Sequence, residues 1–153
     1  MIPMLAATAH AQRGRISEKE AQLIASKLST LRSNVTIHLY TSSSNTAKTR
    51  RTQTLVDHIR DISSHIRVVR HDMDAEPALK EDLEVDHGPV LALTGDRFQG
   101  HSYYGLPSQL ELEPFLDGII IVAGQGAALL PETDRFLGEL EKAVHIRVFV
   151  TPD

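Results

Sequence analysis

The chain contains no cysteine and therefore no thiolate nucleophile, so a run of serine hydroxyls is the first candidate for nucleophilic chemistry. Three serines follow one another in Thr41-Ser42-Ser43-Ser44-Asn45, and Asp86-His87 could supply an acid–base pair for one of them, such as Ser43. A serine hydrolase also needs a strained nucleophile elbow and an oxyanion hole. The serines lie just before an expected helix, which is where the catalytic serine of such a hydrolase lies, but the Gly-x-Ser-x-Gly pattern is missing. We therefore interpret this run as a polar loop and helix N-cap.

Eight histidines raise the question of a metal site. His65 and His71 flank an expected strand, and His71-Asp72-Met73-Asp74 adds two carboxylates. A metal site needs three or four ligands that converge in space, yet no His-x-His or His-x-x-x-His spacing occurs. The glycines do not form a dinucleotide-binding fingerprint either. The sequence therefore predicts neither a metal site nor a bound cofactor.

Composition indicates a soluble globular protein of 153 residues, with 41% hydrophobic and 24% charged residues. A net charge of -4 and a pI near 6.0 argue against a nucleic-acid partner, which usually meets a basic surface. The apolar N-terminus lacks the basic start of a signal peptide, and the Ile119–Ala123 run is too short to cross a bilayer. We expect a cytoplasmic chain with no membrane partner.

Hydrophobic periodicity predicts an alternation of helices and strands. A capping box at Ser17 and Glu20 begins the first helix, and alternation of Val35, Ile37 and Leu39 marks the first strand. The order strand, helix, strand favours a parallel crossover, and the turn at Gly95-Asp96 predicts a hairpin. The expected helices cover 17–31, 46–63, 76–83, 108–123 and 131–144, and the expected strands 35–40, 66–70, 90–94 and 98–103.

The C-terminal segment repeats the beginning of the chain. A helix and a strand cover 17–40, and a helix and a strand cover 131–150, where Val148, Phe149 and Val150 are strand formers. Pro152 ends that strand because proline has no N–H to donate. We interpret residues 1–144 as one unit and residues 145–153 as the first strand of a second unit.

This order of elements resembles the thioredoxin-like fold. The strand Val35–Tyr40, the Gly88-Pro89 entry to the next strand and the run Tyr103-Tyr104-Gly105-Leu106-Pro107-Ser108 carry the resemblance, together with Val148–Pro152. They are similar to the first of two tandem folds in glutaredoxin-like protein disulfide oxidoreductases. They are also similar to the N-terminal domain of the alkyl hydroperoxide reductase flavoprotein subunit. The resemblance implies a three-layer α/β/α sandwich with a central mixed four-stranded sheet.

The resemblance also implies where redox cysteines would lie. One position is the loop after the first strand, where this chain has Ser42, Ser43, Ser44 and Asn45, and the other follows Asp153. Serine cannot replace cysteine because its alkoxide is far less accessible than a thiolate and it forms no disulfide. In the flavoprotein subunit the first fold is likewise free of cysteine. Pro89 occupies the position of the family's cis-proline, and Gly88-Pro89 would face the degenerate loop across a groove.

Two functions follow from the resemblance. The first is a non-catalytic unit of a disulfide oxidoreductase or alkyl hydroperoxide reductase-type protein, with a scaffold or docking role in thiol–disulfide electron transfer. The catalytic half is then expected beyond Asp153, and either a cut fragment or a selenocysteine codon read as stop would account for the sequence ending there. The alternative is a self-contained module that binds a peptide or protein in the groove between Ser42–Asn45 and Gly88-Pro89.

The partner that we expect is a protein or a second thioredoxin-like unit. Ile146, Val148, Phe149 and Val150 would leave an apolar strand with unpaired backbone groups, and such edges recruit partners. The strand could fold back on its own unit or pair with another copy. We favour a homodimer through residues 145–150, because one patch then satisfies itself under two-fold symmetry.

Overall fold

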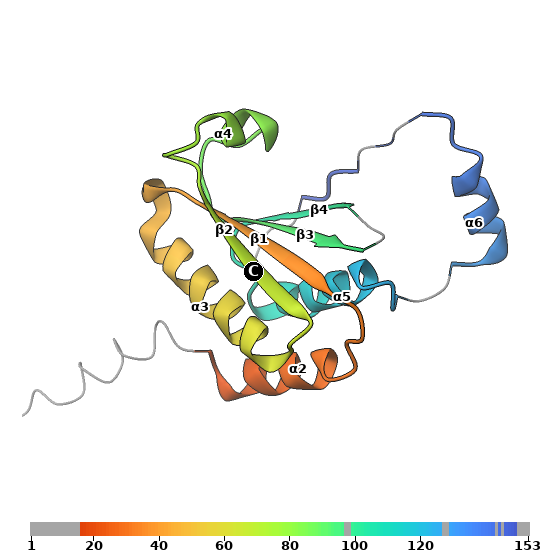
Figure 1. The fold of residues 1–153 in the computed structure, drawn as a ribbon, viewed down its shortest axis with the longest axis horizontal. Helices are drawn as coiled ribbons and strands as arrows, with labels where there is room; N and C mark the ends of the chain where they lie inside the picture. Colours follow the sequence, from red (N-terminus) through yellow and green to blue (C-terminus); the bar gives the residue numbers. More distant parts are fainter. Residues whose placement is uncertain (1–15, 97–98, 127–128, 143, 145, 150–153) are drawn as a thin grey trace, which may run out of the picture.

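The computed structural model of the chain describes residues 16–96, 99–126, 129–142, 144 and 146–149 (Figure 1). Helices and strands alternate through most of this region, close to the predicted bounds. The elements are α2 (Glu18–Leu28), β1 (Val35–Thr41), η1 (Ser43–Asn45), α3 (Thr46–Ile62), β2 (Ile66–Asp72), α4 (Ala78–Asp82), β3 (Val90–Gly95), β4 (Gln99–Tyr104), η2 (Gln109–Glu111), α5 (Leu112–Val122) and α6 (Pro131–Gly138).

The strands form one mixed four-stranded sheet in the order β2-β1-β3-β4. β1 pairs in parallel with β2, where Ile37 lies opposite Val68, and antiparallel with β3, where Ile37 lies opposite Leu93. β3 and β4 form the predicted antiparallel hairpin, with an irregularity between Leu93 and Thr94. The prediction of a central mixed sheet with a parallel first pair is therefore confirmed.

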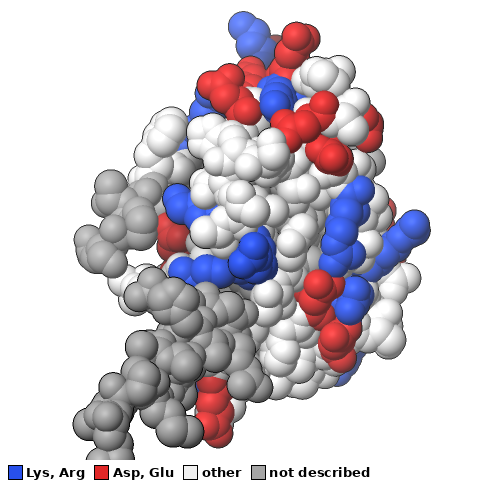
Figure 2. All heavy atoms as spheres, turned by 90° about the vertical axis from the view of Figure 1, so that its left-hand side faces the viewer, with Lys and Arg blue, Asp and Glu red and all other residues white. Residues whose placement is uncertain are grey.

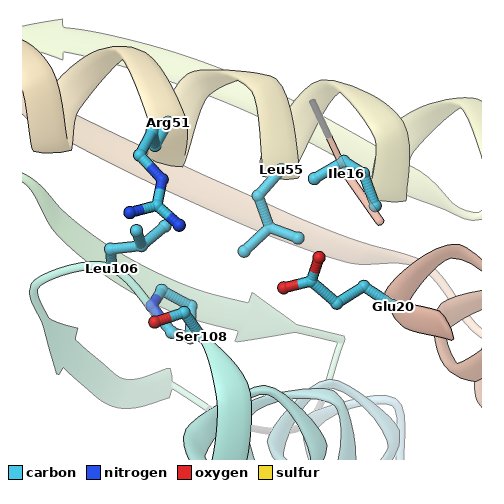
Figure 3. Close-up of a pocket in the computed structure, with 7 residues that line it drawn as sticks. Ile16, Glu20, Arg51, Leu55, Leu106 and Ser108 are labelled. Atoms are coloured by element: carbon cyan, nitrogen blue, oxygen red, sulfur yellow. The ribbon is translucent and has the colours of Figure 1, made fainter. Parts of the chain in front are cut away.

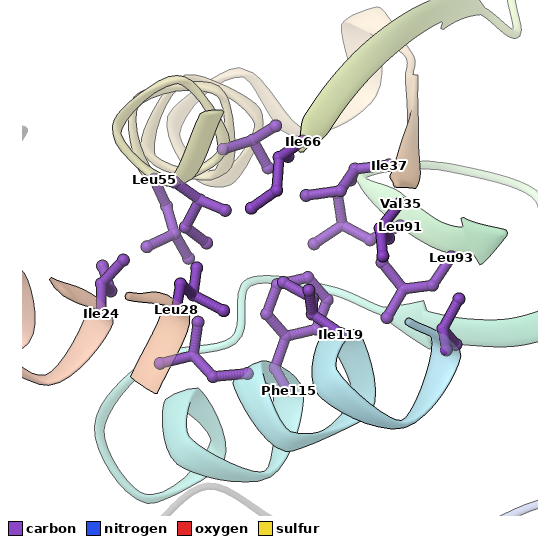
Figure 4. Close-up of a cluster of buried hydrophobic side chains, with 14 of the residues drawn as sticks. Ile24, Leu28, Val35, Ile37, Leu55, Ile66, Leu91, Leu93, Phe115 and Ile119 are labelled. Atoms are coloured by element: carbon purple, nitrogen blue, oxygen red, sulfur yellow. The ribbon is translucent and has the colours of Figure 1, made fainter. Parts of the chain in front are cut away.

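One hydrophobic core lies between the sheet and α2, α3 and α5 (Figure 4). Strand alternation in β1 directs Val35, Ile37 and Leu39 into this core, and each is at most 1% exposed. Figure 4 shows Leu28 of α2, Leu55 of α3 and Phe115 of α5 converging on the same space. A single core thus fixes three helices relative to β1.

The opposite face of the sheet carries much less helix. α4 lies beyond the carboxyl ends of β1 and β2 (Figure 1), and the turn after it reaches this face, where the Tyr104 hydroxyl donates to the Leu83 carbonyl over 3.3 Å. The third layer of the predicted sandwich therefore consists of a short helix at one end of the sheet. We call the remainder of this surface, centred on His38 and Tyr40, the open sheet face.

Three predicted segments differ from the observed ones. The helix expected over 108–123 begins with the 3-10 turn η2, and Pro114 is the third residue of α5, where no backbone hydrogen bond within the helix is lost. The helix expected over 131–144 ends at Gly138. Phe98, the first residue of the expected 98–103 strand, and residues 145 and 150–153 lie outside the described residues.

The segment 146–149 forms no strand within the described structure, and its side chains are exposed. The predicted strand was assigned to the sheet of a second unit. Its role in such a sheet stays a prediction. Arg147 pairs with Glu84, so the segment passes the turn after α4.

Truncating a core side chain of β1 tests the dependence of the fold on this strand. Leu39→Ala should lower the free energy of unfolding by about 2–5 kcal/mol, because Leu39 is 0% exposed and its loss leaves a cavity. Urea denaturation followed by circular dichroism measures this. The control Leu110→Ala removes a side chain that is 80% exposed and should change stability by less than about 0.5 kcal/mol. Equal effects of the two variants would contradict the assigned core.

Candidate functional site

The loop after β1 and the Gly88–Pro89 segment are in direct contact. β1 ends at Thr41, η1 covers Ser43–Asn45, and α3 follows directly. The Gly88 N–H donates to Ser42 Oγ over 3.0 Å in a buried contact, and Ser42 is only 7% exposed. Ser42 Oγ also lies 2.8 Å from Ser44 Oγ. The Ser42 side chain therefore connects two segments that are 46 residues apart in sequence.

The Gly88–Pro89 peptide bond is cis, which confirms the expectation for this position. A Cβ atom on Gly88 would lie 2.9 Å from both Met73 Cε and the Tyr40 carbonyl oxygen, so a larger residue would displace backbone. The Pro89 carbonyl accepts a hydrogen bond from the Gly105 N–H over 2.9 Å. Glycine is needed here because the segment packs directly against the end of β1.

Asp74 supports the same loop from the other side. Its Oδ2 accepts a 2.7 Å hydrogen bond from the Ser43 backbone N–H, and its Oδ1 lies 3.0 Å from Lys80 Nζ. These contacts favour the ionised carboxylate and lower the pKa of Asp74 to about 2, the backbone N–H of Ser43 being the largest cause. The loop is held by a carboxylate that stays charged throughout the neutral range.

The serine run does not form the constellation of a hydrolase among the described residues. Asp86 and His87 are both exposed, and no hydrogen bond joins either of them to Ser42, Ser43 or Ser44. Ser42 Oγ instead accepts from the Gly88 N–H. A buried hydroxyl that already accepts a backbone hydrogen bond and lacks a base is a structural group.

A cluster that motif spacing could not reveal lies on the open sheet face. His38 of β1 and His71 of β2 place Nδ1 and Nε2 3.1 Å apart, and His38 Nε2 lies 3.2 Å from Thr94 Oγ1 of β3. The ring of Tyr40 stacks on His71 with 4.4 Å between centroids. Partial burial, then the neighbouring His71 and Arg67, lower the pKa of His38. Strand alternation places His38 and Tyr40 on one face, but the pairing of β1 with β2 was needed to add His71.

A crevice between α2, α3 and the loop before α5 is too small for a substrate. Figure 3 shows Arg51 extending from α3 toward Leu106 and Ser108, with Glu20 on the other side of Leu55. The volume of this crevice is about 20 Å³, which is enough for about one water molecule. We therefore place no binding function there.

The charges on one side of the molecule are mixed. Figure 2 shows Lys and Arg side chains interspersed with Asp and Glu and separated by uncharged areas, and this face shows no continuous basic stripe. In the described part of the chain, no helix is long and apolar enough to cross a membrane. Within the same residues, no group of three or more His, Asp or Glu side chains could hold a metal ion.

Three of the solved structures that resemble this chain have TM-scores above 0.6. One is the NTD_N/C domain of alkyl hydroperoxide reductase AhpF from Enterococcus faecalis, with a TM-score of 0.65 and 18% identity over 79% of this chain and 59% of that chain. Another is a C503A mutant of the same AhpF subunit, with a TM-score of 0.67 and 19% identity over 83% of this chain and 62% of that chain. The third is a protein disulfide oxidoreductase from Aeropyrum pernix, with a TM-score of 0.66 and 17% identity over 81% of this chain and 55% of that chain. No protein-family model matches the sequence, and no curated protein matches it.

These similarities establish the fold. The chain has a thioredoxin-like α/β fold, and its arrangement matches that of the AhpF N-terminal domain and of a protein disulfide oxidoreductase. The chain spans 55–62% of the length of these three structures.

Removal of the Ser42 hydroxyl tests the contact that joins the two loops. Ser42→Ala should lower the free energy of unfolding by about 1–3 kcal/mol, because the buried Gly88 N–H loses its acceptor. The matched control is Ser64→Ala, in the exposed turn between α3 and β2, where the change should stay within about 0.5 kcal/mol. Chemical denaturation of both variants measures this. An unchanged Ser42→Ala variant would show that the hydrogen bond contributes nothing.

Acid should weaken the loop through Asp74. The folded pKa of about 2 lies below the ordinary value of 3.8, so the Asp74 contribution to stability is present above pH 3.8 and is lost as the pH falls toward 2. NMR titration of side-chain carboxyl carbons should place Asp74 near 2. Asp74→Asn should remove this part of the acid dependence. An Asp74 that titrates near 3.8 would contradict the loop geometry.

Proposed function

We propose that this chain is a non-catalytic thioredoxin-like unit with a scaffold or docking role in thiol–disulfide electron transfer. One observation carries the proposal. The loop that the resemblance identifies as the redox position contains Ser42–Asn45, lies against Gly88–Pro89 and is held by Ser42 Oγ. The fold is retained at this position, while the sulfur that redox chemistry needs is missing from the whole chain.

The contacts at the loop favour a structural role. Ser42 accepts from the Gly88 N–H, and Ser43 donates its backbone N–H to Asp74, so these polar groups of the loop are occupied by protein partners. In a redox unit, the nucleophile must be accessible to a disulfide. Ser42, Gly88 and Pro89 are all buried. The proposal assigns catalysis to a partner unit that carries the cysteines, so that the parent protein is a disulfide oxidoreductase.

The alternative function is a peptide- or protein-binding module that uses the groove between Ser42–Asn45 and Gly88–Pro89. Exposure of Ser43 and Ser44 at the rim is compatible with it. The buried Gly88 N–H, however, already donates to Ser42 and is therefore unavailable to an extended peptide. This contact favours the scaffold role.

The docking role rests on a concentration of exposed apolar side chains near the C-terminus. Nine of the twelve large hydrophobic residues that are exposed in the described structure fall within 129–149, and the core is closed without them. We call them the apolar tail surface: Leu129, Leu130, Phe136, Leu137, Leu140, Val144, Ile146, Val148 and Phe149.

These side chains are large, apolar and exposed, and apolar side chains exposed in such number favour burial against a partner. We propose that residues 145–153 form the first strand of a second thioredoxin-like unit wherever such a unit is present. For the 153-residue chain alone, we propose a homodimer that buries residues 145–150.

Disulfide reduction tests the non-catalytic role. The chain should reduce insulin disulfides in the presence of dithiothreitol no faster than dithiothreitol alone, because it has no thiol to exchange. The turbidity of precipitating insulin measures the rate, with a two-cysteine thioredoxin as the positive control. A reproducible rate above the uncatalysed one would overturn the proposal.

Sedimentation velocity tests the association. The chain should sediment as a concentration-dependent dimer, and Val148→Asp combined with Phe149→Asp should shift it to the monomer, because two charges enter an apolar interface. Leu110→Asp is the control, since Leu110 is 80% exposed and lies outside the apolar tail surface. A chain that stays monomeric at high micromolar concentration would exclude the dimer.

A further inference from the structure

The segment 146–149 meets the turn after α4 through a salt bridge between Arg147 and Glu84. The apolar neighbours of Arg147 are not buried by this contact, since Ile146, Val148 and Phe149 are 79%, 78% and 91% exposed. Burial of apolar surface is the main favourable contribution to protein association. The segment is therefore anchored by its charge, while its apolar side chains still lack a partner within their own chain.

The turn after α4 and the end of β4 offer an apolar surface beside Glu84. Tyr104 is 56% exposed, and its hydroxyl donates to the Leu83 carbonyl over 3.3 Å, so the ring lies against the turn. Leu83 and Val85 are partly exposed in the same turn. The Val85 N–H donates to the Lys80 carbonyl over 2.9 Å, which holds the turn in place. We call Leu83, Glu84, Val85 and Tyr104 the acceptor patch.

The backbone of Glu84 indicates that its side chain has a use. Its φ angle is 54°, in the left-handed region that glycine adopts at a lower cost than any residue with a Cβ atom. A carboxylate is thus kept at a position where glycine would fit the backbone better. Such conformations are concentrated at sites that bind, which suits a residue whose side chain receives Arg147.

The charges around the acceptor patch and those of the C-terminal segment are complementary. Four exposed carboxylates lie on α4 and the turn after it: Glu81, Asp82, Glu84 and Asp86. Residues 142–152 contain Lys142 and Arg147 and no acidic residue. Complementary charges orient two surfaces as they approach and disfavour other pairings. The acidic surround of the patch therefore selects a basic and apolar segment such as 146–149.

We propose that the segment 146–149 docks on the acceptor patch of a second copy of the chain, and that the second copy returns the same contact. Arg147 of each copy then pairs with Glu84 of the other, and the apolar side chains beside Arg147 cover Tyr104. Exchange of an identical segment is a low-cost route to a dimer, because a contact made within one chain is made again between two. This inference rests on the homodimer of the proposed function and adds the surface that receives the segment.

The connection between the segment and the rest of the chain permits the exchange. Residues 139–142 and 144 form no helix or strand, and α6 stands apart from the sheet (Figure 1). An extended chain spans about 3.3 Å per residue, so residues 139–145 reach up to roughly 23 Å. The segment can leave its own turn for that of another copy while every described helix and strand stays intact.

Charge reversal in two separate chains distinguishes exchange from a contact within one chain. Arg147→Glu and Glu84→Arg should each raise the dissociation constant of the dimer by at least about tenfold, because each dimer then contains two like-charged pairs. A 1:1 mixture of the two variants should restore the dimer, since each variant supplies the charge that the other lacks. Sedimentation velocity measures both effects.

The control Arg50→Glu makes the same change of charge at an exposed position of α3 and should leave the dimer unchanged. Circular dichroism of each variant establishes that it is folded before the comparison is made. A mixture that stays monomeric would overturn the exchange, and recovery in one chain that carries both substitutions would then assign the salt bridge to a single chain.

Single variants that dimerise as strongly as the unchanged chain would also overturn the exchange, because the dimer would then use another surface. That result leaves the homodimer and the non-catalytic role in place. An unchanged chain that stays monomeric would instead overturn the homodimer together with this inference. Failure of the exchange and failure of the proposed association are therefore distinguishable.

Discussion

The position of β1 at the centre of the sheet is the constraint on which the rest of the structure depends. β1 pairs with β2 on one side and β3 on the other, and the core helices α2, α3 and α5 pack against its apolar side chains. A strand with two neighbours and a covered face cannot shift register without exposing Val35, Ile37 and Leu39. The loop that follows β1 is therefore fixed in space, and with it the candidate site.

The candidate site is the loop after β1, where the resemblance predicts a redox centre and this chain has serine hydroxyls in place of thiols. The buried Ser42 hydroxyl accepts the Gly88 N–H, which joins the loop after β1 to the start of β3. Asp74 and Lys80 hold the outer side of the loop through charge-assisted contacts. These bonds stabilise a closed loop, whereas a reactive thiolate would need an accessible position.

Two surfaces lie outside the core, and they differ in chemistry. The apolar tail surface, which includes Phe136 and Phe149, suits a protein interface because its side chains are large and uncharged. The open sheet face instead carries half-buried imidazoles and a tyrosine ring near Arg67. The core helices leave the open sheet face uncovered, since all three pack on the other side of the sheet.

The sequence by itself determined where the helices and strands form, and it determined which chemistry is excluded. Alternation in 35–40 and the capping box at Ser17 are local signals, and the absence of cysteine excludes thiol exchange in any fold. The tertiary structure decided which distant groups meet. Gly88 contacts Ser42, which is 46 positions away in the sequence, and His71 contacts His38, which is 33 positions away. No short-range sequence pattern indicates these contacts. They exist because strand pairing and burial, which act over the whole chain, bring separate segments to hydrogen-bonding distance.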